Sequence, residues 1–180
     1  MFNWTKKIHL VRGIAGEGKS SLALDLVNGN ADQVVENDDY WLFPTDDSPL
    51  GYKESTKKSW NWPIWFPQYS RKLEYRYEPK MTHLAGYWCG AEAFRRLRVY
   101  NTVAVANTFV KREHIFPYIE EARKLQILVE IHRPSTPWTG NIEECFKRNV
   151  HSVPKETIER MASQWEEITQ EEINVLLELK

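Results

Sequence analysis

Cysteine is scarce in this 180-residue chain, and the two cysteines form no motif. Cys89 and Cys145 stand far apart, and neither has a second ligand at metal-binding spacing. This excludes a disulfide-dense secreted fold and a cysteine-based zinc site. We expect both thiols to be reduced.

Long apolar runs and an excess of charge are also missing. No stretch approaches the roughly 20 apolar residues that span a bilayer, and the N-terminal residues lack a signal-peptide pattern. The net charge is −1, so nucleic acid or anionic lipid can be attracted only through a local patch. No internal repeat is visible. We therefore expect one cytoplasmic domain, residues 1–180, that is not bound to a membrane.

What the chain does contain is an alternation of short apolar runs and longer amphipathic segments. The apolar runs predict buried strands, and the longer segments predict helices. Strands are expected at 7–11, 33–36, 102–108 and 127–133, and helices at 19–29, 79–100, 111–126, 142–152, 154–168 and 169–180. This alternation favours an α/β fold with a largely parallel sheet. Pro117 stands inside one expected helix and should disturb it.

The segment "RGIAGEGKSSLA" follows the first expected strand and matches G-x-x-x-x-G-K-[ST] through Gly13, Gly18, Lys19 and Ser20. Glycines let backbone N–H groups turn around an anion, and the N-terminus of the next helix favours negative charge. We expect Lys19 to reach the β- and γ-phosphates of ATP and Ser20 to bind Mg²⁺. Four neighbours complete the expected nucleotide cradle: Ala15, Gly16, Glu17 and Ser21.

An acid inside an anion-binding loop needs its own explanation. If the backbone N–H of Glu17 faces the phosphate, its side chain would point outward into solvent near a helix N-terminus, where an acid is mildly favoured. We favour this interpretation. The alternative is that Glu17 contacts a basic group on a lid or a partner.

Two acids follow the second expected strand, in "ENDDYW". Asp38 stands where a carboxylate could accept the proton of an attacking hydroxyl, so it is the candidate general base. Asp39 is expected mainly to cap or turn the chain beside the acceptor. The same structural role is the alternative for Asp38.

Taken in order, the motifs resemble a known group of proteins. "RGIAGEGKSSLA", "ENDDYW", "VAVANT", "HRPSTPW" and "CFKRNVHSVPKETIERMASQWE" resemble the motifs of P-loop kinases such as the phage polynucleotide 5′-hydroxyl kinase. They resemble most of all the small AAA-type ATPase domains described as Nedd4-binding-protein-like. The resemblance implies a three-layer P-loop NTPase fold with a parallel sheet. It also implies a helical lid at 141–168. Outside the resemblance, prolines and clustered aromatics break the helix and strand periods, which predicts an inserted, mostly irregular, aromatic-rich segment at 41–78.

The resemblance also assigns roles at matching positions. It implies that Arg148, in the lid, stabilises the transferring phosphoryl group together with Lys19, while Asp38 is the general base. A plain surface charge is the alternative for Arg148. Trp41 replaces the arginine that usually holds acceptor phosphate, and Ala106 and Asn107 stand where an aspartate is usual. Asn107 could still hydrogen-bond an acceptor, so the departures concern the acceptor half of the site.

Tryptophan is unusually frequent, with eight residues that lie mostly between Trp41 and Trp88. In residues 51–80, aromatics alternate with seven lysines or arginines against three glutamates, a local charge of +4. Aromatics and cations together are the ingredients of a single-strand or flipped-base site. A small local core or a protein interface is the alternative. The candidate acceptor contacts are Asp39, Trp41, Trp60, Trp62, Trp65, His83, Trp88 and Asn107.

The sequence therefore predicts a kinase that uses ATP and Mg²⁺ to phosphorylate a hydroxyl on a nucleic acid, with DNA favoured. The hydroxyl is a 5′-end, or the hydroxymethyl group of 5-hydroxymethyluracil as in phage DNA hypermodification. A small-molecule kinase and a non-enzymatic ATP-binding interaction module are further alternatives. His132 and His151 have no visible partner set, so no metal site is expected at either.

Overall fold

A four-stranded parallel sheet forms the centre of the computed structural model, which describes residues 6–44 and 73–178. The strand order is β2-β5-β1-β6. The bounds are β1 (Lys7–Val11), β2 (Val34–Glu36), β5 (Thr102–Ala106) and β6 (Leu128–His132). Valine and isoleucine dominate these short strands, as expected where both faces are covered. The α/β class is confirmed, and each strand lies within two residues of its predicted bounds.

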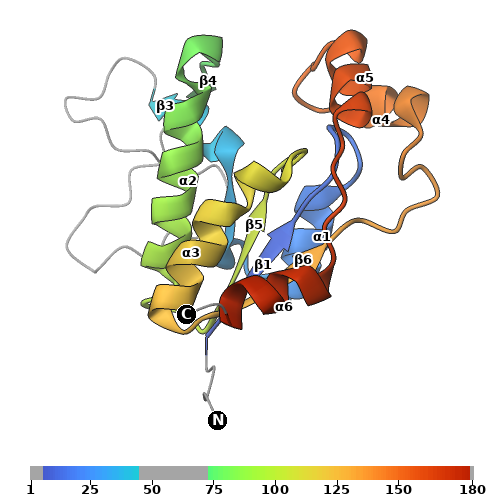
Figure 1. Cartoon of the computed structure of the whole chain (residues 1–180). Coiled ribbons are helices and arrows are strands. Elements are labelled where there is room, and N and C mark those ends of the chain that lie inside the picture. Colours follow the sequence, from blue (N-terminus) through green and yellow to red (C-terminus); the bar gives the residue numbers. More distant parts are fainter. Residues whose placement is uncertain (1–5, 45–72, 179–180) are drawn as a thin grey trace.

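Helices cover both faces of the sheet and complete three layers (Figure 1). On one face lies α1 (Lys19–Leu26), whose buried Ala23 packs against Val11. The other face carries α2 (Thr82–Arg96), α3 (Phe116–Leu125) and α6 (Gln170–Glu178). Because side chains alternate along β1, Ile8 and Leu10 enter this second, larger core.

The order of the strands creates a topological switch point between β1 and β5. The chain leaves β1 through α1 and reaches β2 on one side, whereas it leaves β5 through α3 and reaches β6 on the other. The two neighbouring strands β1 and β5 therefore send their connections in opposite directions. Ligands of open α/β sheets bind at such a point, outside the carboxyl ends of the strands.

A separate pair of helices, α4 (Ile142–Arg148) and α5 (Lys155–Ser163), stands beside the loop after β1 (Figure 1). The two helices share a small core in which Ile14 of that loop meets Cys145 and Ile158. Both α4 and α5 are shorter than the sequence pattern predicts, and Pro154 caps α5 instead of lying inside its first turn. No helix within the described ranges is both long and apolar enough to cross a membrane.

Two expected helices begin differently from the prediction. Residues 111–126 form the short 3₁₀ helix η4 (Arg112–His114) and then α3, with Pro117 in the first turn of α3. A first-turn proline lacks only an N–H that has no helical partner, so Pro117 starts the helix without disturbing it. In the same way η3 (Pro79–Met81) precedes α2. A further 3₁₀ turn, η1 (Ala31–Gln33), leads into β2.

The segment that was expected to be mostly irregular has regular ends. After β2 the chain forms η2 (Asn37–Trp41) and then β3 (Leu42–Pro44), which pairs antiparallel with β4 (Leu73–Tyr75). The sequence predicted neither strand, because prolines and clustered aromatics hide a strand period. Residues 45–72 lie outside the described ranges.

Both thiols are expected to be unreactive in the native protein. Cys89 and Cys145 are 0% exposed. Burial raises the pKa of the Cys89 thiol to about 12, and it also raises the pKa of Cys145. The thiolate is the nucleophile, so a raised pKa removes the reactive form at mildly alkaline pH. A disulfide reagent such as DTNB should release both equivalents only in denaturant, and a fast equivalent without denaturant would contradict this placement.

Candidate functional site

The glycine-rich loop joins β1 to α1 at the carboxyl edge of the sheet. Gly18 precedes the helix with a φ of +94°, a left-handed conformation that favours glycine. The side chain of Lys19 folds back across the loop, and its Nζ donates to the carbonyl oxygen of Ile14 at 2.9 Å. Ser20 and Ser21 are exposed at the start of α1. The loop thus has the strand–loop–helix context that its motif requires.

The ammonium group of Lys19 lies in a field of carboxylates. Burial lowers the pKa of Lys19, and the negative charges around it act in the opposite direction. These charges belong to Glu17, Glu36 and Asp38. An electropositive loop and an acidic neighbourhood therefore meet at one place, which is the charge pattern of a site that holds a phosphate together with a cation.

Glu17 is 0% exposed, so the prediction that its carboxylate lies in solvent is wrong. Its Oε2 accepts from the backbone N of Ile14 at 2.9 Å, and its Oε1 accepts from Arg133 Nη2 at 2.9 Å and from the N of Gly140 at 2.9 Å. The carboxylate does contact a basic group, as the alternative held, but that group is Arg133, which lies directly after β6 and not on the expected lid at 141–168 or on a partner. The carboxylate ties the loop to the segment after β6, which the local sequence could not indicate because Arg133 is far away in the chain.

Two glycines of the loop are required by close packing. A Cβ on Gly13 would overlap the carboxylate of Glu17, and one on Gly16 would overlap the carbonyl oxygen of Cys145 in α4. Gly16 also has a φ of +83°. The loop is thus held from inside by its own acid and from outside by the helical pair.

Gly16→Ala is expected to lower the free energy of unfolding by about 2–5 kcal/mol, because a left-handed residue costs about 1–2 kcal/mol and overpacking about 1–3 kcal/mol. Gly29→Ala is the matched control. Gly29 has a φ of +78° but nothing within 4 Å of an added Cβ, so only the backbone cost applies. Urea unfolding of both variants separates the two effects, and equal losses would contradict the contact with α4.

Arg12 precedes the loop and is 2% exposed. Its Nη2 donates to three carbonyl oxygens, and its guanidinium carbon lies 4.0 Å from the centroid of the Trp165 ring. The carbonyls belong to Phe109, Val110 and Glu166. Arg133 lies over the same ring at 4.3 Å. Two arginines therefore fasten the start of the loop to the connection between α5 and α6, a role that the sequence alone did not reveal.

The candidate base Asp38 lies in η2, directly after β2. Asn107, at the end of β5, accepts a hydrogen bond at its Oδ1 from the backbone N of Asn37 at 2.8 Å. Asn107 thereby anchors the start of η2. The Oδ2 of Asp38 lies 3.4 Å from Nε2 of His151, which follows α4. The acid thus stands between the sheet and the helical pair, on the same side as the loop.

Asp39 has the structural role that was expected of it. Its Oδ2 accepts from the backbone N of Glu36 at 3.2 Å, which caps the first turn of η2. This contact turns the chain immediately before the candidate base.

Glu36 is a site residue that the sequence analysis missed. Glu36 is 9% exposed and pairs in register with Ala106. The P-loop kinases that this sequence resembles carry an acid at the position of Ala106. The side chain of Glu36 lies on the face of Val34, the face covered by α1. Its Oε1 is buried with no hydrogen-bond partner within residues 6–44 and 73–178. The acid that is absent at Ala106 in β5 is therefore supplied by Glu36 on the neighbouring strand. The sequence analysis missed Glu36 because it stands inside an expected strand.

Arg148 is linked to the glycine-rich loop indirectly, by the ring of Trp138. Its guanidinium carbon lies 4.0 Å from the centroid of the Trp138 ring, and Trp138 Nε1 donates to the carbonyl oxygen of Gly16 at 3.3 Å. Its Nε also lies 3.8 Å from the carboxylate of Glu144. The side chain is 49% exposed, at the edge of the helical pair.

The candidate acceptor residues divide into packed and exposed ones. Trp41 is 2% exposed and packs edge-on against Tyr40 and Tyr77, so its ring is part of the interior. Trp88 is half-buried against Tyr40, whereas His83 is exposed. Both polar groups of Asn107 serve the protein, since its Nδ2 donates to the sulfur of Cys89. Trp60, Trp62 and Trp65 lie outside the described residues.

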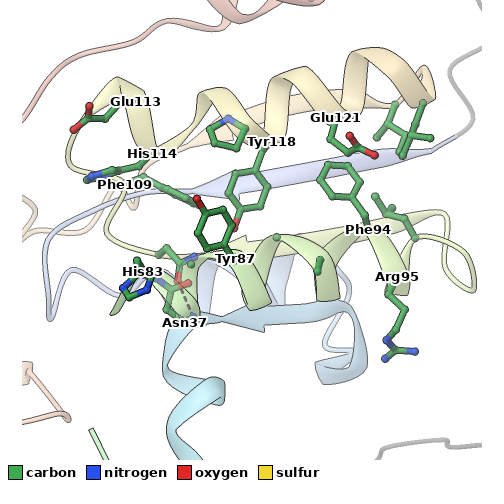
Figure 2. Close-up of a pocket in the computed structure, with 18 of the residues that line it drawn as sticks. Asn37, His83, Tyr87, Phe94, Arg95, Phe109, Glu113, His114, Tyr118 and Glu121 are labelled. Atoms are coloured by element: carbon green, nitrogen blue, oxygen red, sulfur yellow. Dashed lines mark hydrogen bonds between the residues drawn. The ribbon is translucent and has the colours of Figure 1, made fainter. Parts of the chain in front are cut away.

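A groove of about 1230 Å³ runs between α2 and α3 and ends at the carboxyl edge of the sheet, where Asn37 and Asn107 line it. Figure 2 shows Tyr87 and Tyr118 projecting into it from opposite helices, with His83 near the end that Asn37 lines. Tyr87 is 78% exposed. Trp88, by contrast, is not among the residues that line the groove.

Comparison with known proteins shows only weak sequence similarity. No protein-family model matches the chain. The chain is 26% identical over 161 residues to human NEDD4-binding protein 2, a match that covers 87% of this chain but only 7% of that protein. Together with the parallel sheet and its glycine-rich loop, this likeness supports a P-loop fold of the NTPase type.

Proposed function

We propose that the protein is an ATP-dependent kinase that transfers the γ-phosphoryl group to a hydroxyl on a nucleic acid. The observation that carries this proposal is the convergence at one sheet edge of the Lys19 loop with two carboxylates, those of Glu36 and Asp38. A P-loop that only binds nucleotide needs no second acid beside the phosphates. A phosphotransferase needs one group to hold the metal and another to accept a proton.

The residues present fit a nucleotide with Mg²⁺. Gly18 adopts the backbone that turns N–H groups toward an anion, and Ser20 stands in the first turn of α1. The buried, unpartnered Oε1 of Glu36 is an oxygen that a hydrated Mg²⁺ could satisfy. Ser20 and Glu36 would thus hold the cation, which when bound neutralises charge on the phosphates.

Asp38 would hold the acceptor hydroxyl and take its proton. The anchor from Asn107 to the start of η2 and the cap made by Asp39 fix the backbone on both sides of it. Arg148 would stabilise the charge that spreads over the phosphoryl oxygens once the helical pair closes on the nucleotide. Its stack on Trp138, whose Nε1 donates to the carbonyl oxygen of Gly16 in the loop, supports this role.

The groove between α2 and α3 supports a nucleic-acid acceptor. It opens at Asn37, one residue from Asp38, and Tyr87 offers an exposed ring on which a base could stack. Whether the hydroxyl is a 5′-end or belongs to a modified base depends on residues 45–72 as well. The tryptophans of that segment remain candidates for stacking. A small molecule that carries a nucleoside would use the same ring.

An ATP-binding interaction module is the second candidate. Ala106 stands where the kinases that this sequence resembles carry an acid, and the human relative is named as a protein that binds another protein, NEDD4. Glu36 favours the enzyme over the interaction module, because it supplies a carboxylate on the neighbouring strand, in register with Ala106.

Transfer of γ-labelled phosphate to a panel of acceptors tests the proposal. The panel holds 5′-hydroxyl DNA and RNA, 5-hydroxymethyluracil DNA with blocked ends, and free nucleosides, with Lys19→Ala as the control. Label on one nucleic acid, absent in the control, supports the kinase and identifies the hydroxyl. ATP binding without label on any acceptor would overturn it in favour of the interaction module, and label on nucleosides alone would change the acceptor class.

A further inference from the structure

A compact group of metal-ligating side chains lies apart from the nucleotide loop, on the α1 face of the sheet. His9 lies on β1, and Glu130 and His132 lie two residues apart on the neighbouring strand β6. His9 pairs in register with Glu130. Because side chains two residues apart share one face of a strand, the sheet itself brings the three groups together.

The separations of the three ligand atoms match a metal coordination sphere. His9 Nδ1 lies 2.9 Å from His132 Nε2 and 3.2 Å from Glu130 Oε2, and His132 Nε2 lies 3.7 Å from the same oxygen. Metal–nitrogen bonds of about 2.0–2.1 Å place neighbouring ligands about 3.3 Å apart in a tetrahedron and about 2.9 Å apart in an octahedron. One cation fits between the three atoms without a change of backbone.

The surroundings prepare these groups as ligands. The other oxygen of Glu130 forms an ion pair with Lys7 Nζ at 2.6 Å, which orients the carboxylate so that Oε2 faces the imidazoles. His9 is only 5% exposed. Glu130 and His132 are partly exposed, which leaves a path for the ion and a position for water.

We propose that His9, Glu130 and His132 bind one divalent transition-metal ion, a site distinct from the Mg²⁺–nucleotide site. Two imidazoles and one carboxylate favour a borderline cation such as Zn²⁺ over Mg²⁺, which prefers oxygen ligands. The ion would join the edge strand β6 to the strand that carries the loop. The inference does not depend on the proposed kinase activity.

The test is calorimetric titration of the EDTA-stripped protein with ZnCl₂ in the absence of nucleotide. We expect one Zn²⁺ per chain and a higher melting temperature with Zn²⁺ but not with Mg²⁺. His132→Ala and the nearly isosteric Glu130→Gln should each weaken binding by roughly a hundredfold or more, since even the loss of an outer-shell partner costs about 10–100-fold. His114→Ala, a variant of an exposed histidine in η4, is the matched control and should bind like the parent.

Circular dichroism and the melting temperature in EDTA establish that each variant is folded, and Glu130→Gln keeps the test valid if His132→Ala is unstable. Co²⁺ substitution identifies the ligands, because thiolate ligation adds a charge-transfer band that nitrogen and oxygen ligation lacks. Two results would overturn the site: Zn²⁺ binding by the parent no tighter than by folded Glu130→Gln, or a thiolate band with Co²⁺.

Discussion

Asp38→Asn is expected to slow phosphoryl transfer by about 10²–10⁴-fold, the contribution typical of a positioned general base. Asparagine keeps the size of the side chain but cannot take the proton of the acceptor hydroxyl. The backbone of η2 is held by Asn107 and by the Asp39 cap, so the loop and its nucleotide should be unaffected. The loss should therefore appear in kcat with unchanged affinity for ATP.

Single-turnover transfer with labelled ATP measures the chemical step, and a fluorescent nucleotide measures binding. Asp25→Asn is the control, because Asp25 is an exposed acid on α1 and its loss changes the net charge by the same amount. Transfer at the parental rate in Asp38→Asn would refute the assignment of the base. A parallel loss of nucleotide affinity would instead make Asp38 a part of the binding site.

Glu17→Ala is expected to lower the free energy of unfolding by about 2–4 kcal/mol, the range for breaking a buried charge pair whose partners lose their acceptor. The backbone N of Ile14 is buried and would be left without its carboxylate oxygen. Arg133 keeps part of its hydration, since its side chain is 34% exposed, which places the cost below that of a fully buried pair.

Glu167→Ala is the matched control for Glu17→Ala. Glu167 lies 3.7 Å from the same guanidinium, but its side chain is 73% exposed. Exposed ion pairs contribute about 0–1 kcal/mol, so this variant should unfold close to the parental midpoint. Equal midpoints for the two variants in urea would show that the buried carboxylate does not stabilise the loop.

The strand–loop–helix arrangement around the glycine-rich loop was predictable because it is local in the chain. A strand, a glycine-rich turn and the first turn of a helix are adjacent in the chain, so the spacing of Gly18, Lys19 and Ser20 already describes their arrangement. The parallel sheet was predictable for a similar reason, since buried strands and amphipathic helices have different periods.

What the sequence could not show depends on contacts between distant segments. Glu17 was expected in solvent because its neutralising partner, Arg133, follows a strand more than a hundred residues later. Glu36 was overlooked because its candidate role in the site depends on its register with Ala106 on another strand. His132 was likewise set aside because it had no visible partner set, and only the pairing of β1 with β6 brings His9 beside it.

The hydrogen bond from Arg12 to the carbonyl oxygen of Glu166, at 2.6 Å, has a consequence for the order of synthesis. The glycine-rich loop leaves the ribosome before residue 166, which follows Arg12 by 154 residues and supplies one of its hydrogen-bond acceptors. Until Trp165 and Glu166 have left the exit tunnel, the guanidinium of Arg12 lacks both its aromatic cover and one of its acceptors. A nascent chain would thus carry an incompletely fastened loop until Trp165 and Glu166 have emerged, and nucleotide binding should mature only once these two residues can pack against Arg12.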